Sequence, residues 1–237
     1  MNMDTLFYEG SRKRISRAGK DDLLVLQFKD AETEFDGEKR SKFKNKCVLK
    51  TKITKTLFEY LEGYNVPNHY HTCLGTDSIE VFKLDMLPVK VMIRNVAAGS
   101  LCRRFAVEEG TMLKYPILEY YLQNDELEQQ LISESHAYAF GYAQPEEMKH
   151  ISRLASKVNA VLKSYFERRH VKLIDFQLQF GRCNNKIMVG DEISPDNFRI
   201  WEIKNGTNAF NKQTFSFKDE KAKKSYDELL IRLIGKA

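Results

Sequence analysis

The chain has 237 residues, a length that fits one large domain or two small ones. Hydrophobic residues make up 42% and charged residues 30%, which is typical of a globular protein and excludes a disordered one. No apolar run approaches the roughly 20 residues that cross a bilayer, and the N-terminus has no apolar stretch typical of a signal peptide. The four cysteines are scattered and form no CxxC pair, so we expect a reduced, cytoplasmic protein without a zinc ribbon or disulfide scaffold.

The net charge of +5 is unevenly distributed along the chain. Residues 37–55 contain eight basic side chains and a single acid, Glu38. Such a run could grip a nucleic-acid backbone or attract an anionic substrate. A solvated face explains the same run equally well, so both interpretations stay open.

The apolar patterns predict a mixture of strands and helices. In chain order we expect strands over 6–15 and 23–29, a helix over 50–62, strands over 68–74 and 79–84, a helix over 145–169, a hairpin over 171–190 and a helix over 218–234. The segment Leu84–Pro88 looks like a crossing between two parts of the chain. This order predicts an α+β protein with two lobes, 1–86 and 87–237, and a cleft between them.

The predicted hairpin carries the most informative pattern. On its first strand the expected apolar face is Lys172 (the terminal exception), Ile174, Phe176, Leu178 and Phe180, and the expected polar face is Asp175, Gln177 and Gln179. The return strand brings Asp191 and Glu192 opposite the polar face, and the next turn adds Asp196 and Arg199. A surface strand would show the same alternation, but carboxylates around such a turn favour the handling of a metal and phosphate.

Three further patterns are weaker. A small-residue turn ending at Ser100 lies among the arginines Arg94, Arg103 and Arg104, a setting that suits phosphate although no Walker loop occurs. Lys13 follows a glycine on a predicted strand, as cations do over nucleotide phosphates in kinases.

Histidines and a cysteine alternate at His69, His71 and Cys73 and would share one face of a strand. A zinc site there lacks a fourth ligand, so an edge strand with ordinary histidines is the favoured interpretation.

Together these segments resemble the SAICAR synthetase family of purine biosynthesis. The family's landmarks occur in order over nearly the whole chain: LFYEG, LDMLPV, RNVAAGSL, SESHAYAFGYAQPEE, LIDFQLQFG and GDEISPDNFRIW. The resemblance implies a two-lobed fold related to kinases and ATP-grasp enzymes, with lobe 1–86 covering ATP, and it suggests a homodimer. It also implies an ATP- and Mg²⁺-dependent ligase that joins carboxyaminoimidazole ribonucleotide (CAIR) to L-aspartate through an acyl phosphate.

The resemblance also implies roles for individual residues. ATP would be bound by Lys13, Lys83 and Met86, and Mg²⁺ would be held by Asp191 and Glu192. The ribonucleotide phosphate would be bound by Arg94, Ser100 and Arg199. The catalytic carboxylates in the cleft would be Asp175, Asp191 and Asp196.

Seven positions depart from the family pattern. Ser11, Gln123 and Gln177 stand where the family has lysine, Lys90 and Gln179 where it has glutamate, Gln129 where it has aspartate, and Ser216 where it has arginine. Most of these changes replace a charge by a neutral polar group, and a neutral amide binds Mg²⁺ more weakly than a carboxylate does. Three hypotheses therefore stand: an ordinary SAICAR-forming ligase, a ligase for another acid or amine, and a ribonucleotide-binding protein without catalysis. Nucleic-acid binding is disfavoured, because the family region that matches 37–55 lies beside the active site.

Overall fold

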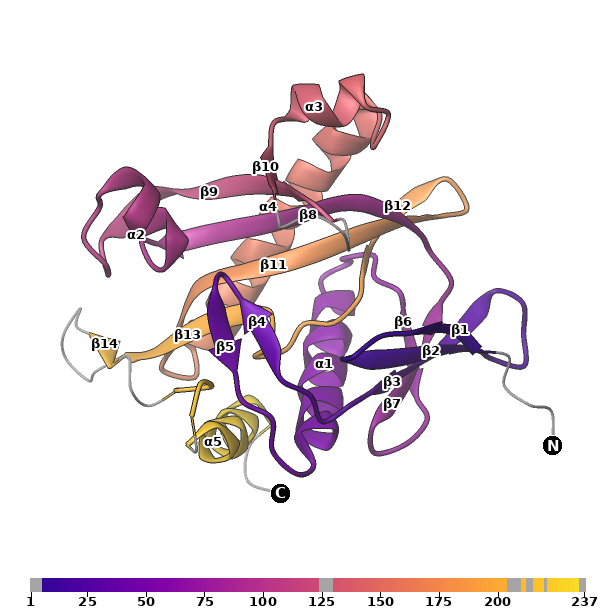
Figure 1. Ribbon diagram of the computed structural model, residues 1–237, viewed down its shortest axis with the longest axis horizontal. Helices are drawn as coiled ribbons and strands as arrows, with labels where there is room; N and C mark the ends of the chain where they lie inside the picture. The colour runs from indigo at the N-terminus through magenta and orange to yellow at the C-terminus, as the bar shows by residue number, and fades with distance from the viewer. Residues whose placement is uncertain (1–5, 124–129, 204–209, 212–214, 220, 235–237) are drawn as a thin grey trace.

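Two antiparallel sheets form the framework of the protein, seen in a computed structural model that describes residues 6–123, 130–203, 210–211, 215–219 and 221–234 (Figure 1). The first sheet has the strand order β1 (Leu6–Glu9), β2 (Lys13–Arg17), β3 (Leu23–Phe28), β7 (Ser78–Phe82) and β6 (Tyr70–Cys73). The second has the order β10 (Gln130–Ile132), β9 (Met112–Leu122), β8 (Asp85–Val96), β11 (Val171–Cys183), β13 (Phe198–Ile203) and β14 (Phe210–Asn211), with β12 (Lys186–Gly190) paired to β11. The α+β expectation is confirmed.

A short hairpin of β4 (Thr33–Phe35) and β5 (Glu38–Arg40) stands apart from both sheets. Asp36 and Gly37 form its two-residue turn with φ of 54° and 77°, and left-handed residues at both positions give a turn that suits the twist of a hairpin. The turn points Asp36 toward β8, where it becomes part of the site.

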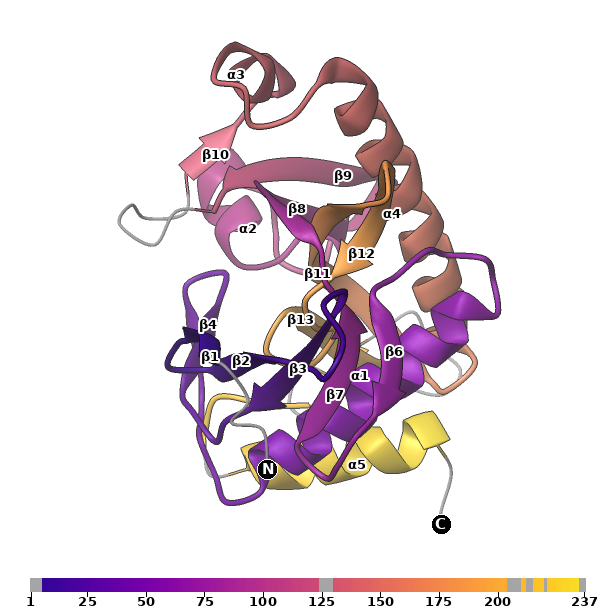
Figure 2. The same ribbon diagram turned by 90° about the vertical axis from the view of Figure 1, so that its right-hand side faces the viewer.

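The helices are α1 (Lys46–Glu62), α2 (Ser100–Phe105), α3 (Glu134–Ala139), α4 (Pro145–Glu167) and α5 (Ala222–Ile234). Helix α4 begins as its sequence predicts, with a proline in the first turn and a capping box between Gln144 and Glu147. It packs along β11, while α1 packs against α5 and the first sheet (Figure 2). Within the described residues no helix is long and apolar enough to cross a membrane.

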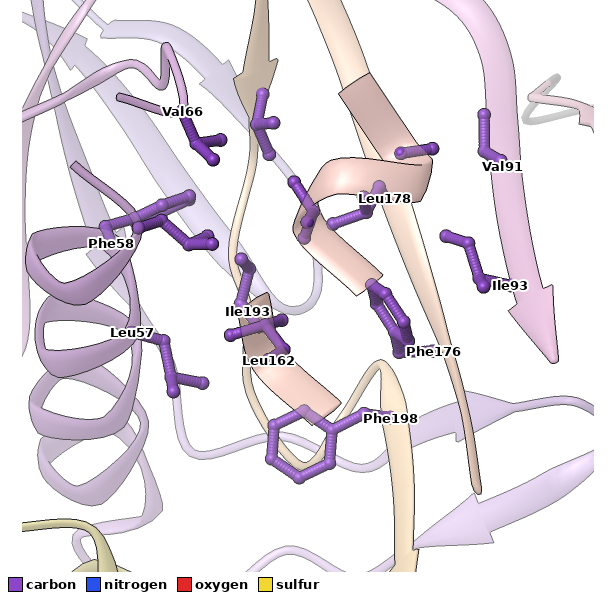
Figure 3. Close-up of a cluster of buried hydrophobic side chains, with 14 of the residues drawn as sticks. Leu57, Phe58, Val66, Val91, Ile93, Leu162, Phe176, Leu178, Ile193 and Phe198 are labelled. Atoms are coloured by element: carbon purple, nitrogen blue, oxygen red, sulfur yellow. The ribbon is translucent and has the colours of Figure 1, made fainter. Parts of the chain in front are cut away.

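One hydrophobic core joins the two halves of the molecule. Figure 3 shows Leu57 and Phe58 of α1 facing Phe176 and Leu178 of β11 across Ile193. The predicted division at residue 86 falls just inside β8, and residues on both sides of it belong to this core. The parts of the chain before and after the predicted division therefore pack in one shared core.

Several predicted boundaries are wrong. The strand expected over 6–15 is two strands, because the chain turns between β1 and β2. Helix α1 begins at Lys46 rather than at residue 50, and α5 begins at Ala222 rather than at 218. The first turn of α1 was hidden because its buried side chains, Lys46 and Lys50, are charged and interrupt the apolar stripe.

The predicted phase of β11 is also partly wrong. A register shift between Leu173 and Asp175 breaks the alternation, so that Leu173 packs in the main core and Ile174 does not. Ile174 instead packs with Trp201 on the other face. An irregularity of this kind inserts a residue into one strand and reverses the facing of everything before it.

Candidate active site

A cavity of about 690 Å³ lies between the first sheet and the beginning of β8. Its walls are largely apolar and are formed by Ile15, Leu24, Leu26, Val81, Phe82, Leu84, Met86 and Leu87. One end is polar, where Lys13, Gln179 and Asp191 meet. An apolar slot with a few converging polar groups is the usual form of a site for a small ligand, and this one suits a base at one end and phosphates at the other.

Asp191 is fixed at the polar end by contacts on every side. Its carboxylate forms an ion pair with the Lys13 ammonium and accepts a hydrogen bond of 3.1 Å from Nε2 of Gln179. Its backbone is in the left-handed region, with φ of 63°, and its carbonyl oxygen lies 2.8 Å from Nε2 of His69. Burial, helped by the charge of Lys13, lowers the pKa of His69 to about 3, so the ring is neutral and its N–H donates to this carbonyl.

The donor set at this end fits a magnesium ion that arrives with a nucleotide. Mg²⁺ is usually held by one or two carboxylates together with substrate phosphates, and Asp191 supplies one carboxylate with the Gln179 amide beside it. Among the described residues no three His, Cys, Asp or Glu side chains are grouped to hold a metal by themselves. Any metal here would therefore depend on phosphate oxygens for most of its ligands.

Glu192, the second expected metal ligand, is engaged elsewhere. Lys50 lies 3.1 Å from its carboxylate, and the Ser194 hydroxyl donates a hydrogen bond of 2.6 Å to it. Asp196 accepts contacts from Lys46 at 2.8 Å and from Lys50 at 2.9 Å. These pairs fix the loop after β12 on α1, and this geometry favours Asp191 over Glu192 as the metal ligand.

The buried pairs also set the charge of Asp196. Burial alone would raise the pKa of this carboxyl, but the charges of Lys50 and Lys46 hold it well below its ordinary value. The Tyr226 hydroxyl of α5 donates a further hydrogen bond of 2.9 Å to Asp196. Asp196 is therefore an ionised anchor between α1, α5 and the loop.

A second, small hollow of about 30 Å³ adjoins the polar end, and we call it the polar chamber. It is lined by Arg12, Lys90, Gln177, Gln179, Asp191, Glu192, Asp196 and Asn197. Gln179 and Asp191 line both spaces, so the two lie side by side at these residues. Three positions that depart from the family pattern, Lys90, Gln177 and Gln179, gather in this chamber.

The predicted phosphate clamp is assembled, and it is occupied by a carboxylate of the protein. Arg94 is fully buried and lies 2.9 Å from the Ser100 hydroxyl. Asp36 accepts hydrogen bonds from Ser100, at 2.5 Å to the hydroxyl and 3.1 Å to the backbone N–H, and from Arg94 and Arg199 at 3.3 and 3.0 Å. The hairpin carboxylate thus sits where the residue types lead one to expect a phosphate.

Two further acidic side chains, Glu119 and Asp175, contact Arg94. Glu119 of β9 accepts a hydrogen bond of 2.6 Å from Nε of Arg94, and Asp175 lies 3.3 Å from Nη1 of the same arginine. Burial raises the pKa of Asp175 to about 6, although the neighbouring charges of Arg199 and Arg94 oppose the rise. Sequence reasoning missed Asp36 and Glu119, because neither stands in a motif. Only the Asp-Gly turn at 36–37 was a visible signal of the hairpin.

Of the remaining predicted positions, only some line the nucleotide-sized cavity. Lys83 is exposed and does not line the nucleotide-sized cavity, and its ammonium lies 5.7 Å from the centre of the Phe7 ring. Gln123 lines that cavity, whereas Ser11 is exposed on the turn before β2. Ser216 lines a separate cavity of about 390 Å³. Gln129 lies outside the described residues.

The basic run over 37–55 does not form one basic surface, and the histidines at 69 and 71 do not share one face of a strand. Arg40, Lys46 and Lys50 are buried, so the run over 37–55 is not a continuous exposed basic face. A register shift in β6 breaks the alternation of the histidines, leaving His69 buried beside Asp191 and His71 3.7 Å from Glu80. Neither feature therefore indicates a nucleic-acid or zinc site.

Gly99 gives a direct test of the clamp. A Cβ at this position would collide with the Asp36 carboxylate and lie 2.7 Å from the Arg199 guanidinium. We expect Gly99→Ala to lower the free energy of unfolding by about 2 kcal/mol more than the control Gly110→Ala does. Gly110 also has a positive φ, of 101°, but nothing lies within 4 Å of its missing Cβ. Urea denaturation measures both variants, and equal losses would mean that Asp36 does not occupy the clamp.

Comparison with known proteins identifies the family. The SAICAR synthetase family model matches residues 6–233. Phosphoribosylaminoimidazole-succinocarboxamide synthase of Prosthecochloris aestuarii is 39% identical over 99% of both chains, and that of Chlorobaculum tepidum is 41% identical over 87% of this chain and 88% of its own. The solved synthase of Ehrlichia chaffeensis superposes with a TM-score of 0.87 at 32% identity, over 98% of this chain and 99% of its own. A SAICAR synthetase in complex with ADP gives a TM-score of 0.87 at 38% identity, over 97% of both chains. This chain belongs to the SAICAR synthetase family.

Proposed function

We propose that the two adjoining spaces carry out the reaction of the family in this chain. The chain is an ATP-dependent ligase that joins the carboxylate of CAIR to the amine of L-aspartate, giving SAICAR, ADP and phosphate. The observation that carries the residue assignment is that Gln179 and Asp191 line both the nucleotide-sized cavity and the polar chamber. Full-length similarity to relatives named for this activity supports the ordinary ligase over a repurposed one.

In the first step the cavity holds ATP with its phosphates at the polar end. Lys13 would neutralise phosphate charge, and Asp191 would hold Mg²⁺, which when bound would draw charge from the phosphate oxygens. An oxygen of the CAIR carboxylate attacks the γ-phosphorus, and the bond from that phosphorus to ADP breaks. This step is needed because a carboxylate is a poor electrophile and the acyl phosphate supplies a leaving group.

In the second step the aspartate amine attacks the acyl carbon. The bond from that carbon to the phosphate oxygen breaks, and the departing phosphate takes up the proton that the nitrogen loses as the amide forms. During both steps Arg94, Ser100 and Arg199 would hold the ribonucleotide phosphate in place of the Asp36 carboxylate that they hold now. A dianionic phosphate offers more acceptor oxygens to this set than one carboxylate does.

Release of ADP by the purified chain tests this function. The protein is incubated with Mg-ATP, CAIR and L-aspartate, and each component is then omitted in turn. Release that requires all three is the expected result. If a thermal shift shows that CAIR binds but no ADP appears, the ordinary ligase is excluded, and other acids, other amines or a binding role come next.

A substitution at Gln179 tests where Mg²⁺ binds. Its Nε2 lies 3.1 Å from the Asp191 carboxylate, so glutamate at this position would place a second carboxylate at the metal site. We expect Gln179→Glu to lower the Mg²⁺ concentration for half-maximal ADP release by about tenfold. The exposed Gln27, which contacts Asp77, gives the matched control Gln27→Glu, which should leave that concentration unchanged. An unchanged magnesium dependence in Gln179→Glu would contradict the assignment of the metal to this end.

We further propose that the protein works in the cytoplasm, which its four scattered cysteines, with no CxxC pair among them, support. The homodimer suggested by the family resemblance stays a prediction.

A further inference from the structure

Lys90 is a buried cation for which the described part of the chain offers no ion-pair partner. It lies on β8 in the middle of the second sheet, opposite Gln179 of β11 on one side and Tyr121 of β9 on the other. Only 8% of the residue is exposed, and it lines the polar chamber. Within the described part of the chain it makes no hydrogen bond or ion pair, although burying an ammonium without either is costly.

The acids around the chamber are already matched with other groups. Asp191 is paired with Lys13, and Glu192 and Asp196 are both paired with Lys50. The other cation on the chamber wall, Arg12, also makes no ion pair within the described residues. The chamber therefore presents positive charge that no acid beside it balances.

Burial, reinforced by the charge of Arg12, lowers the pKa of Lys90 to about 8. An anion in the chamber would offset the free-energy cost of desolvating the ammonium and would return that pKa toward its ordinary value. The geometry alone already points the same way, because an unpaired donor faces a space that holds about one small group.

The position of the chamber limits which anion it can receive. It adjoins the nucleotide-sized cavity at Gln179 and Asp191, at the end where the phosphates would lie. An oxyanion there is either the γ-phosphoryl group of ATP or the carboxylate that accepts it. We propose that Lys90 binds the oxyanion at the point of phosphoryl transfer, an assignment that rests on the proposed ligase function.

The test compares affinities of the whole chain and of Lys90→Met, in which an apolar stem of similar length replaces the lysine. Calorimetry measures ATP against ADP, and CAIR against the same ribonucleotide without its carboxylate. If Lys90 binds the γ-phosphoryl group, ATP binding weakens by about ten- to hundredfold while ADP binding stays within twofold. If it binds the acceptor carboxylate, only the preference for CAIR falls by that factor. Unchanged preferences in both comparisons would overturn the proposal.

Controls separate this outcome from misfolding and from failure of the ligase function. Lys149→Gln on α4, whose side chain is 57% exposed, should leave all four affinities unchanged. Lys90→Arg, which keeps the charge, should restore at least part of the lost preference. If Lys90→Met does not fold, Lys90→Gln, which also removes the charge, gives the same comparison. Loss of the ATP preference in Lys90→Met supports the proposal even if the wild-type chain forms no SAICAR, because the binding comparison needs no turnover.

Discussion

Replacement of Arg94 by methionine should lower the free energy of unfolding by about 3–5 kcal/mol, a large part of the roughly 5–15 kcal/mol that stabilises an ordinary domain. The guanidinium is fully buried and is the shared partner of Asp36, Glu119 and Asp175. Without Arg94, these three buried carboxylates would face one another, and only part of the positive charge that neutralises them would remain. The loss is large because removing one member of a buried ionic cluster leaves the other charges without compensation, whereas the cluster as a whole contributes little.

Urea denaturation followed by circular dichroism measures this loss, and Arg14→Met is its control. Arg14 is 49% exposed in its pair with Glu9, and such surface pairs contribute at most about 1 kcal/mol. A midpoint for Arg94→Met within error of that of Arg14→Met would show that the clamp does not depend on Arg94.

The elements that were predicted correctly carry their own local signal. Helix α4 has a proline in its first turn and an uninterrupted apolar stripe, and the β11–β12 hairpin turns at Asn184 and Asn185, both with positive φ. Helix α1 was predicted a turn too short, because Lys46 and Lys50 are buried through contacts with Asp196 and Glu192. These partners lie more than a hundred residues away, and no window of sequence contains both.

The same limit applies to the site. Short motifs predicted that Arg94, Ser100 and Arg199 belong together, and the structure brings all three onto one carboxylate. That this carboxylate is Asp36 follows from the placement of the β4–β5 hairpin against β8, which depends on tertiary packing rather than on local pattern. The shift that misplaced Ile174 is likewise invisible in the sequence, because the residues on both faces of β11 there are buried.

Asp191→Ala should reduce the rate of ADP release by about a thousandfold or more. Asp191 is the carboxylate that the geometry favours as metal ligand, and Gln179 beside it offers only a neutral amide. The variant should nevertheless fold, since the side chain of Asp191 is 13% exposed and its backbone contact with His69 does not depend on the carboxylate.

Binding of ADP with and without Mg²⁺ separates loss of the metal from loss of the nucleotide site. In Asp191→Ala the gain in ADP affinity that Mg²⁺ provides should disappear. Affinity for metal-free ADP should stay the same or rise, because a negative charge has been removed from beside the phosphates and Lys13 has been released to meet them. The exposed Asp227 of α5, which pairs with Lys223, gives the control Asp227→Ala, which should keep both turnover and the magnesium effect. If metal-free ADP bound more weakly to Asp191→Ala, the carboxylate would be supporting the nucleotide directly, and its assignment as the metal ligand would be wrong.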